Sequence, residues 1–303
     1  MFADRLTQAI KNAKSSLCAG LDVSIEKLPR FIRDDAASKS NSNDELIYTC
    51  LTRFFNIVIP AIAEKVAAIK PNLAYFEQYG VAGLRAYCYL RDLAQSRSLL
   101  VIADAKRGDI GPTAEAYAKA FLSPSGTLNA DALTVNPFLG LDTLEPFVKI
   151  AAEHGRGVFV LVKTSNPGSA ALQSPRDQAN RSASEIVADW LTERGSALQG
   201  SSGWSSLGAV IGATYPAELT ALRSRMPKCY FLVPGMGAQG GSAADAAHAF
   251  AKVPGSAPGG AVINVSRGIF GELPQEISND NELATLVAQR TAGFNDSLNA
   301  ALL

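Results

Sequence analysis

Residues 99–110 bring three charged side chains together at the end of an apolar run. The segment reads Leu-Leu-Val-Ile-Ala-Asp-Ala-Lys-Arg-Gly-Asp-Ile, and its charges include Asp104, Lys106 and Asp109. Because residues two apart on a strand point to the same face, we expect Asp104 beside Lys106, with Asp109 one short turn beyond. Such charges are costly to bury unless paired, but they suit a substrate that needs fixed charge in a dry site. A salt bridge that caps a buried strand is the alternative, and the other strand ends decide between the two.

Polar groups also follow most of the other apolar runs. They are Asp22 after the first run, Lys70 and Asn72 after the second, residues 163–166 after the fifth, residues 234–241 after the seventh and residues 264–268 at the eighth. The strands of a parallel barrel place their carboxyl ends on one rim, where the active sites of such barrels lie. Polar groups at six of eight strand ends are hard to explain by stability alone, so they predict a functional site on that rim.

The elements that must position these residues alternate in type along the whole chain. Short apolar runs, expected as strands, lie at 17–23, 66–71, 99–105, 132–136, 158–163, 207–213, 230–234 and 261–265. Helical patterns lie at 44–65, 75–97, 113–121, 141–153, 182–194, 216–225, 243–252 and 281–299. Near-continuously apolar strands are typical of a parallel sheet covered on both faces. Eight such units predict one α/β domain over residues 1–303, a (β/α)8 TIM barrel. A doubly wound open sheet is the alternative, but no G-x-G-x-x-G follows an early strand.

Two stretches exceed the usual loop length and are expected as insertions in loops of the barrel. Residues 26–43 are rich in Ser, Asn and Asp, and residues 170–206 are rich in Ser, Gln and Gly apart from the helical pattern at 182–194. Neither stretch could bury a core by itself, which argues against separate domains. Trp190 and Trp204 are expected to anchor the second insertion to the barrel wall.

Composition excludes several classes of partner. Lys plus Arg and Asp plus Glu both number 28, so no basic field favours nucleic acid. No apolar run is expected to cross a membrane, and the N-terminus resembles an amphipathic helix rather than a signal peptide. The four cysteines, Cys18, Cys50, Cys88 and Cys229, are scattered along the sequence. That spacing suggests reduced thiols and a cytoplasmic protein.

Histidine and cofactor chemistry are poorly supported. The two histidines, His154 and His248, lie in polar, helix-like stretches and are expected on the surface. Zinc chemistry and a Ser-His-Asp triad are therefore disfavoured. The sequence carries no motif for pyridoxal phosphate or thiamine and no metal-ligand spacing, so neither a cofactor nor a metal is expected.

The two halves of the expected site differ in chemistry. The glycine-rich residues 234–241, together with Gln239 and Arg267, suit a phosphate, because backbone N–H groups approach closely and Arg offers a fork of donors. The other half is an array of alternating charge, made of Asp22, Lys70, Asp104, Lys106 and Asp109. Each charge keeps its neighbour ionised, so a Lys between carboxylates stays protonated and can act as a general acid towards a carbanion.

The motif D-x-K-x-x-D-I, which residues 104–110 match at every specified position, resembles the orotidine 5′-phosphate decarboxylase family. Residues 70–77, 135–140, 164–168, 234–241 and 264–268 resemble the same family, in the longer variant found among many bacteria. The likeness extends from about residue 17 to residue 270 and so covers nearly the whole chain. The set of motifs in this order is highly specific, whereas D-x-K alone is not.

The resemblance implies a cytoplasmic, homodimeric lyase of UMP biosynthesis that decarboxylates orotidine 5′-monophosphate to UMP without a cofactor. In the family pattern Lys106 delivers a proton to C6 of the pyrimidine, Asp104 lies against the substrate carboxylate, and Lys70 links the ribose to the charge array. Asp109 reaches into the neighbouring subunit's site and contacts a ribose hydroxyl, and Thr113 is expected to do the same.

The resemblance also implies the remaining contacts with the substrate. They are expected at the ribose (Asp22), the pyrimidine amide (Ser165), the phosphate (Gln239, Arg267 and Gly268) and the ribose or base (Asn72 and Asn136). No metal ligand is among them.

Two alternatives belong to other classes of function. Related barrels with a similar D-x-K-x-x-D motif act on sugar phosphates with Mg²⁺, but they need a carboxylate ligand at the end of the second strand, where this chain has Lys70. A nucleotide-binding barrel without turnover would require a broken charge array, and here every member is present. Activity that survives EDTA would separate the decarboxylase from the magnesium-dependent enzymes.

Overall fold

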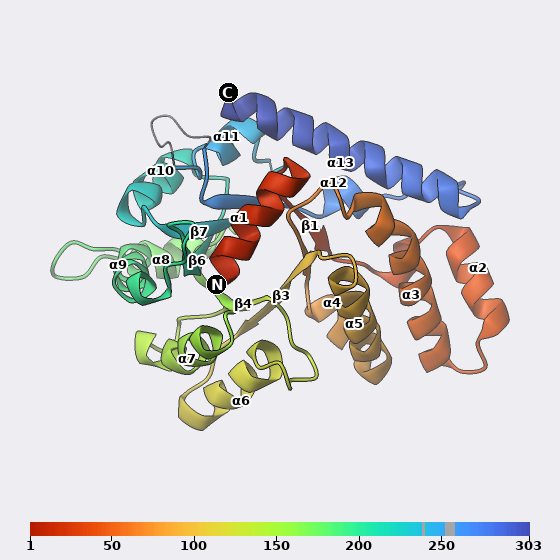
Figure 1. Cartoon of the computed structure of the whole chain (residues 1–303), viewed down its shortest axis with the longest axis horizontal. Coiled ribbons are helices and arrows are strands. Elements are labelled where there is room, and N and C mark those ends of the chain that lie inside the picture. The colour runs from red at the N-terminus through yellow and green to blue at the C-terminus, as the bar shows by residue number, and fades with distance from the viewer. Residues whose placement is uncertain (238–239, 252–257) are drawn as a thin grey trace.

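Eight parallel strands form a closed barrel in the computed structural model, which describes residues 1–237, 240–251 and 258–303 (Figure 1). The strands follow one another in sequence order, and the first is hydrogen-bonded to the second and the eighth. They are β1 (Leu17–Leu21), β2 (Ala68–Pro71), β3 (Leu100–Arg107), β4 (Ala132–Val135), β5 (Gly157–Lys163), β6 (Ser205–Ile211), β7 (Cys229–Pro234) and β8 (Ala261–Val265). The predicted TIM barrel is confirmed, and each strand overlaps the run predicted for it.

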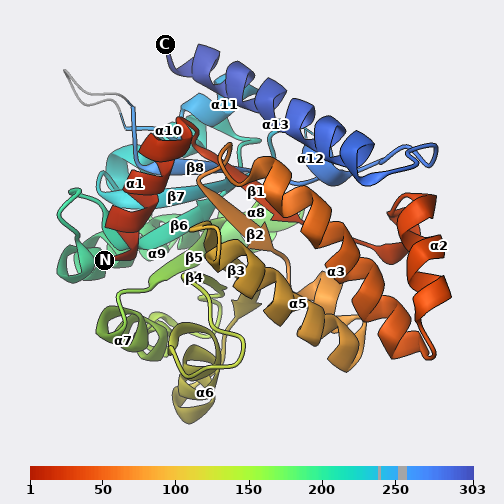
Figure 2. The ribbon, with the colours of Figure 1, turned by 45° about the vertical axis from the view of Figure 1, so that its right-hand side comes forward.

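Helices surround the barrel between successive strands (Figure 2). The α-helices are α1 (Phe2–Ala13), α2 (Arg30–Lys39), α3 (Asn43–Ile62), α4 (Ala74–Glu77), α5 (Gly80–Gln95), α6 (Gly111–Leu122), α7 (Glu145–Glu153), α8 (Ser169–Gln173), α9 (Ala183–Gly195), α10 (Pro216–Arg225), α11 (Ala243–Ala247), α12 (Arg267–Phe270) and α13 (Asp280–Leu302). The 3₁₀ helices are η1 (Ile25–Lys27), η2 (Leu141–Leu144) and η3 (Ser196–Leu198). The outward faces of the strands and the inner faces of these helices form the main core.

A second core fills the interior of the barrel. Along β3, for example, Ile102 belongs to this interior core, whereas Val101 and Ala103 belong to the outer one, as strand alternation requires. α1 packs against the interior core at the amino-terminal end of the barrel, where Phe2 meets Phe159 edge to face at 5.9 Å between ring centroids. The amino-terminal end is therefore closed, and the carboxyl end carries the polar residues.

By length and composition alone, α3 could cross a membrane, which differs from the expectation drawn from the sequence. More than half of its apolar stretch is buried inside the protein. Phe54, Phe55 and Ile59 are among its buried residues, and the helix packs against α2, α5 and α13. Its apolar side chains thus pack in the core between the barrel and the outer helices.

Two predicted segments differ in detail from the structure. The single helix predicted at 75–97 is divided into α4 and α5 at Gly80, whose φ of +58° suits glycine and interrupts the helix. Residues 26–43, predicted as a loop, contain η1 and α2. Ile32 and Ala36 are buried four residues apart on α2, a helical spacing that the surrounding polar residues obscured.

The second long stretch, 170–206, is more than a loop insertion. It includes α9, which connects β5 to β6 as the helix of that barrel unit, preceded by α8 and a loop at 174–182. Trp190 packs against the main core, and the ring of Trp204 lies 5.4 Å from that of Tyr230. The two tryptophans therefore anchor this stretch to the barrel, as predicted.

Candidate active site

The carboxyl end of β3 departs from regular strand geometry. Its pairing with β4 shifts in register between Ala103 and Arg107, and Lys106 has a φ of +48°, which is uncommon for a residue other than glycine. Nζ of Lys106 nevertheless donates to Oδ1 of Asp104 at 2.6 Å. The predicted pairing of these side chains is confirmed, but a strained backbone rather than plain strand alternation directs Lys106.

Asp104 accepts hydrogen bonds from residues of three adjacent strands. Besides Lys106 on β3, Nζ of Lys70 on β2 donates to Oδ2 at 2.5 Å, and Oγ1 of Thr134 on β4 donates to Oδ1 at 3.0 Å. The Thr134 hydroxyl also accepts from the backbone N–H of Lys106 at 3.0 Å. Lys70 and Asp104 are 5% and 8% exposed, whereas the side chain of Lys106 is 46% exposed. The array is therefore buried at Lys70 and open at Lys106.

Burial and charge act in opposite directions on this array. Burial would raise the pKa of Asp104, but the charges of Lys70 and Lys106 and their hydrogen bonds hold it well below its usual range. Burial would also lower the pKa of Lys70, but the charges of Asp104 and then Asp22 raise it above its ordinary value. Asp104 and Lys70 thus remain an ion pair across the neutral range of pH.

A cavity of about 220 Å³ opens at the carboxyl ends of the strands beside the array. Its lining residues are Asp22, Lys70, Asn72, Asp104, Lys106, Thr134, Leu161, Thr164, Ser165, Val210, Leu232, Pro234 and Asn264. Leu161, Val210 and Leu232 pack with the interior core of the barrel. The cavity thus has an apolar part, a charged wall on β1 to β3 and an uncharged polar wall after β5.

Asp22 follows β1 and contributes an unused acceptor to the cavity. Its Oδ1 is buried and has no hydrogen-bond partner among the residues that the structure describes. A buried acceptor without a donor is costly, because it has lost water and gained nothing in exchange. The predicted ribose-binding role of Asp22 would supply the missing donor.

The loop after β5 places Thr164 and Ser165 on the uncharged wall of the cavity. Gln173, at the end of α8, fixes this loop through its amide group. The backbone N–H of Thr164 donates to Oε1 of Gln173 at 2.9 Å, and Nε2 of Gln173 donates to Oγ1 of Thr164 at 2.8 Å. Asn72 also lines the cavity, and its Oδ1 accepts from the backbone N–H of Ala74 at 3.2 Å. Ser165 and Asn72 therefore both line the cavity, and their contact with substrate stays a prediction.

Asp109, Thr113 and Asn136 are predicted site residues that do not line this cavity. Asp109 and Asn136 lie on the neighbouring loops after β3 and β4, and Thr113 lies in the first turn of α6. The backbone N–H of Asn136 donates to the carbonyl of Arg107 at 2.8 Å. Oδ1 of Asp109 accepts from the next backbone N–H, and Oδ1 of Asn136 accepts from that of Phe138. These three residues therefore do not form part of the wall of the cavity in their own chain.

The residues predicted to bind phosphate are less well represented in the cavity wall than those of the charge array. Arg267 is exposed and begins α12, directly beyond the strand end that carries Asn264, but it is not among the cavity residues. Gly268 packs against α13, where a Cβ atom would lie 2.3 Å from Cζ of Phe294. Its small size thus serves helix packing in this chain. Gln239 lies outside the described residues.

Lys163, which the sequence placed on the same rim, belongs to a different cavity of about 380 Å³. The pairing of β5 with β6 shifts in register between Leu161 and Lys163. Nζ of Lys163 bonds Oε2 of Glu218 at 3.0 Å and Oγ of Ser174 at 3.2 Å. This buried cation thus joins β5 to α10 and to the loop after α8, and it does not line the cavity beside Asp104.

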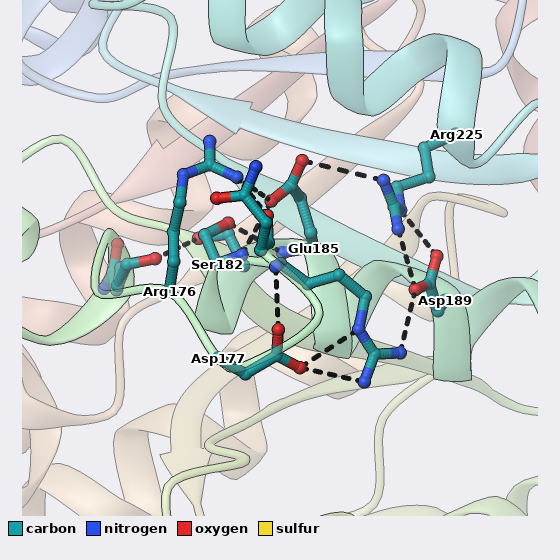
Figure 3. A network of polar contacts seen from close by, with 10 residues as sticks. Arg176, Asp177, Ser182, Glu185, Asp189 and Arg225 are labelled. Atoms are coloured by element: carbon teal, nitrogen blue, oxygen red, sulfur yellow. Dashed lines mark hydrogen bonds and ion pairs between the residues drawn. The ribbon is translucent and has the colours of Figure 1, made fainter.

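A partly exposed group of ion pairs, drawn in Figure 3, shares several residues with the lining of this second cavity. We call it the surface network, and it consists of Arg176, Asp177, Arg181, Ser182, Glu185, Asp189 and Arg225. Arg225 bonds both carboxylate oxygens of Asp189, at 2.5 and 2.8 Å. Ser182 and Glu185 form the capping box of α9. The network joins the loop at 174–182 to α9, and α9 to α10.

Three polar residues that line the cavity have no role predicted from the sequence: Thr134, Thr164 and Asn264. Thr134, on β4, could have been found by strand alternation, since it lies two residues before Asn136, which directly follows that strand. Thr164 and Asn264 lie within the polar strand ends that defined the rim. No pattern in the sequence distinguishes them from polar residues that cap turns.

Comparison with known proteins gives consistent matches over the whole chain. Residues 15–276 match the family described as Orotidine 5′-phosphate decarboxylase / HUMPS family. The chain is 41% identical to the orotidine 5′-phosphate decarboxylase of Rhodopirellula baltica over 100% of this chain and 96% of that protein. It is 35% identical to that of Caldicellulosiruptor bescii over 99% of both chains. The solved structure of Leishmania donovani OMP decarboxylase superposes with a TM-score of 0.71 at 31% identity, over 99% of this chain and 98% of that one.

Proposed function

The chain belongs to the orotidine 5′-phosphate decarboxylase / HUMPS family and acts as an orotidine 5′-phosphate decarboxylase, a carboxy-lyase of pyrimidine biosynthesis. On that premise we propose that Lys106 protonates C6 of the substrate within the array of Asp22, Lys70, Asp104 and Lys106. The observation that carries the proposal is the half-exposed side chain of Lys106. It lines the cavity, and its Nζ is tied to the buried Asp104 at 2.6 Å.

The proposed reaction needs a stabilising cation at one point. Loss of CO₂ breaks the bond between C6 and the carboxylate carbon and leaves the electron pair on C6, in the plane of the ring. The π system of the pyrimidine cannot delocalise that pair, so a fixed positive charge must stabilise it. Lys106 supplies this charge, then transfers a proton from Nζ to C6, and the resulting amine takes a proton from water.

The rest of the array keeps Lys106 ready for this step. Asp104 has both oxygens occupied, by Lys70 on one side and by Lys106 and Thr134 on the other. Its carboxylate is therefore fixed in position and ionised before substrate binds, as electrostatic preorganisation requires. In this proposal the substrate carboxylate binds beside Asp104, and the repulsion between the two falls as neutral CO₂ leaves.

The remaining contacts follow the family pattern. Asp22 and Lys70 bind the ribose, Ser165 bonds the pyrimidine amide, and Asn72 contacts ribose or base. Gln239 and Arg267 bind the phosphate. The proposal is supported for Asp22 by its unused acceptor and for Ser165 and Asn72 by their place in the cavity.

The first test is the loss of orotidine 5′-monophosphate absorbance with purified protein in the presence of EDTA. Rapid conversion to UMP is expected, because no step of the proposed reaction passes through a metal ion. No conversion, with UMP still bound tightly, would instead indicate a nucleotide-binding barrel. Conversion of a sugar phosphate that depends on added Mg²⁺ would indicate the related magnesium-dependent chemistry.

We further propose that two copies of the chain form the working unit, with Asp109 and Thr113 entering the neighbouring site. Two features support this. Neither residue reaches its own chain's cavity. The loops that carry Asp109 and Asn136 also expose Ile110, Phe138 and Leu139. Clustered exposed apolar side chains are typical of an interaction surface, and a two-fold dimer would cover both copies.

Mixing two inactive variants tests this arrangement. Lys106→Ala and Asp109→Ala homodimers are expected to be inactive or nearly so. In a mixed dimer one site carries both defects and the other carries neither, so unfolding and refolding the two together should restore activity. Asp109→Ala mixed with Asp109→Ala is the matched control. Failure of the mixture, with mixed dimers present, would contradict a shared site.

The cytoplasm is the proposed compartment. All four cysteines are free, and Cys18, Cys50 and Cys229 are buried. Free thiols in this number are typical of proteins kept in a reducing environment. Thiol titration of the unfolded protein after purification without reductant should give four thiols per chain, and fewer would contradict the assignment.

A further inference from the structure

We propose that Asn264 is a substrate-binding residue that contacts a ribose hydroxyl beside Asp22. The inference rests on the proposed function and assigns one more residue to it. Asn264 lies on β8, three residues before Arg267, and lines the catalytic cavity. Its register partner on β1 is Cys18, which belongs to the interior core, so the side chain of Asn264 also points into the barrel.

The side-chain oxygen of Asn264 is buried without a partner among the described residues. The residue is 8% exposed, and its Oδ1 makes no hydrogen bond with any residue that the structure describes. A buried oxygen in that state costs stability, because it has lost its hydrogen bonds to water. Most buried polar groups are satisfied, so this oxygen points to a ligand in the cavity that Asn264 lines.

A glycine on the neighbouring strand β1 leaves room for this amide. Gly20 lies beside it on β1, where a Cβ atom would be 2.9 Å from Oδ1 and 3.1 Å from Nδ2 of Asn264. The same Cβ atom would be 2.8 Å from Cβ of Ser266. Any side chain at Gly20 would thus displace the amide. The absence of a side chain lets the amide approach β1, the strand that carries Asp22.

The position of Asn264 and the hydrogen bonds that its amide can form both indicate the ribose as its partner in the nucleotide. β8 lies between β1, which carries the proposed ribose ligand Asp22, and β7, whose following loop belongs to the proposed phosphate site. Ser165, the proposed pyrimidine contact, follows β5, three strands from β8 around the barrel. Oδ1 needs a donor, and a phosphate dianion has none. A ribose hydroxyl can donate to Oδ1 and also accept from Nδ2.

Like Asn264, Asp22 has a buried side-chain oxygen that accepts no hydrogen bond from the described residues. Oδ1 of Asp22 and Oδ1 of Asn264 are both buried acceptors without a donor among the described residues. Asp22 directly follows β1, and Asn264 lies on the adjacent strand β8. The ribose of a nucleotide presents two neighbouring hydroxyl groups. One such group for each acceptor would satisfy both oxygens at once.

The experiment compares three ligands in three proteins. The dissociation constants of UMP, 2′-deoxy-UMP and 3′-deoxy-UMP are measured by calorimetry for the wild type, Asn264→Ala and Asn295→Ala. Asn295, on α13, is a matched control because its amide is already partnered: Nδ2 donates to the carbonyl of Lys65 at 2.7 Å, and Oδ1 accepts from Ser15 at 2.5 Å. Asn264→Ala should weaken UMP binding by about tenfold, the usual effect of one buried hydrogen bond.

The pattern across ligands is the decisive result. In Asn264→Ala, binding of the one deoxynucleotide that lacks the contacted hydroxyl should stay within about twofold of the wild-type value. Asn295→Ala should leave all three affinities unchanged. If Asn264→Ala weakens UMP and both deoxynucleotides equally, or weakens none of them, the inference is overturned.

Two further measurements keep the result interpretable. If Asn264→Ala does not fold, Asn264→Ser replaces it, with the same ligands and the same expected pattern. A crystal structure of the wild type with UMP should show the Asn264 amide within hydrogen-bond distance of a ribose oxygen, and a water molecule there instead would overturn the contact. Turnover of orotidine 5′-monophosphate by the wild type is measured separately, so failure of the proposed function is distinguished from failure of this inference.

Discussion

The catalytic array and the surface network contain the same kinds of group in different surroundings. In the array, the carboxylate of Asp104 is 8% exposed and bonds two ammonium groups. In the surface network, the side chains of Asp189 and Arg225 are 38% and 34% exposed, although their bidentate geometry is as close. Water and salt compete with the second pair and hardly reach the first.

This comparison shows that burial, and not bond length, decides what an ion pair can do. Lys70, Asp104 and Thr134 come from adjacent strands of one barrel, so their positions are fixed by the sheet. A buried pair contributes little net stability, because desolvation offsets attraction, but the loss of one partner leaves a costly charge. The array therefore maintains charge for chemistry, whereas the surface network anchors the segment that carries α8 and α9.

The largest expected effect concerns Lys106. Lys106→Ala should lower kcat by at least about 10⁴-fold, because it removes both the general acid and the charge that stabilises the carbanion. UMP binding should stay nearly intact. Turnover is followed by substrate absorbance, and product binding by calorimetry. Lys119→Ala, which removes an exposed lysine paired with Glu115, is the control and should keep full activity. Wild-type-like turnover of Lys106→Ala would refute the proposed mechanism.

Asp104→Asn tests whether the array depends on its buried carboxylate. This change leaves the buried Lys70 without its counter-ion, so the free energy of unfolding should fall by about 3–5 kcal/mol. Activity should also be lost, because nothing fixes Lys106. Urea unfolding measures the first effect. A loss no larger than that of Asp189→Asn would remove the distinction between the two regions.

The pH dependence of stability sharpens the same distinction. The pKa of Asp104 is lowered in the folded protein, so its contribution is present above its usual pKa and is lost as pH falls through the folded value. The pKa of Lys70 is raised, so its contribution is present below its usual pKa and is lost as pH rises through the folded value. The difference in unfolding free energy between the wild type and Asp104→Asn should thus shrink as pH falls below about 4, where the unfolded carboxyl of the wild type takes up a proton. A difference that stays constant in that acid range, measured by urea unfolding, would contradict this assignment.

The smallest effect is expected in the surface network. Asp189→Asn should lower the free energy of unfolding by less than about 1 kcal/mol, because water screens its pair with Arg225. The loss should diminish further in 1 M salt, as the Debye length falls to about 3 Å. Turnover should not change. A drop in kcat would show that the network positions the site and does more than anchor the segment.

Several parts of the fold and site could be predicted because they depend on local patterns. Eight apolar runs gave the eight strands, and the spacing of Asp104 and Lys106 predicted their pairing, although the backbone at Lys106 is not that of a regular strand. The prediction was less successful where local signals conflicted. Polar residues concealed α2, and Gly80 divided a helix whose periodicity continued across it. Lys163 was grouped with the rim because a shift in register cannot be read from the sequence.

The sequence by itself determined the barrel and the chemical types at its rim, because strand periodicity and residue identity are local properties. Only the tertiary structure decided which of those residues meet. Closure of the sheet brought Lys70 and Thr134 onto Asp104, and a left-handed residue at 106 directed the lysine towards it. Closure also placed β8 beside β1, so that Asn264, whose side-chain oxygen has no partner among the described residues, lies next to Gly20. Burial and the absence of a partner depend on every neighbouring strand at once, and for that reason no local pattern could reveal them.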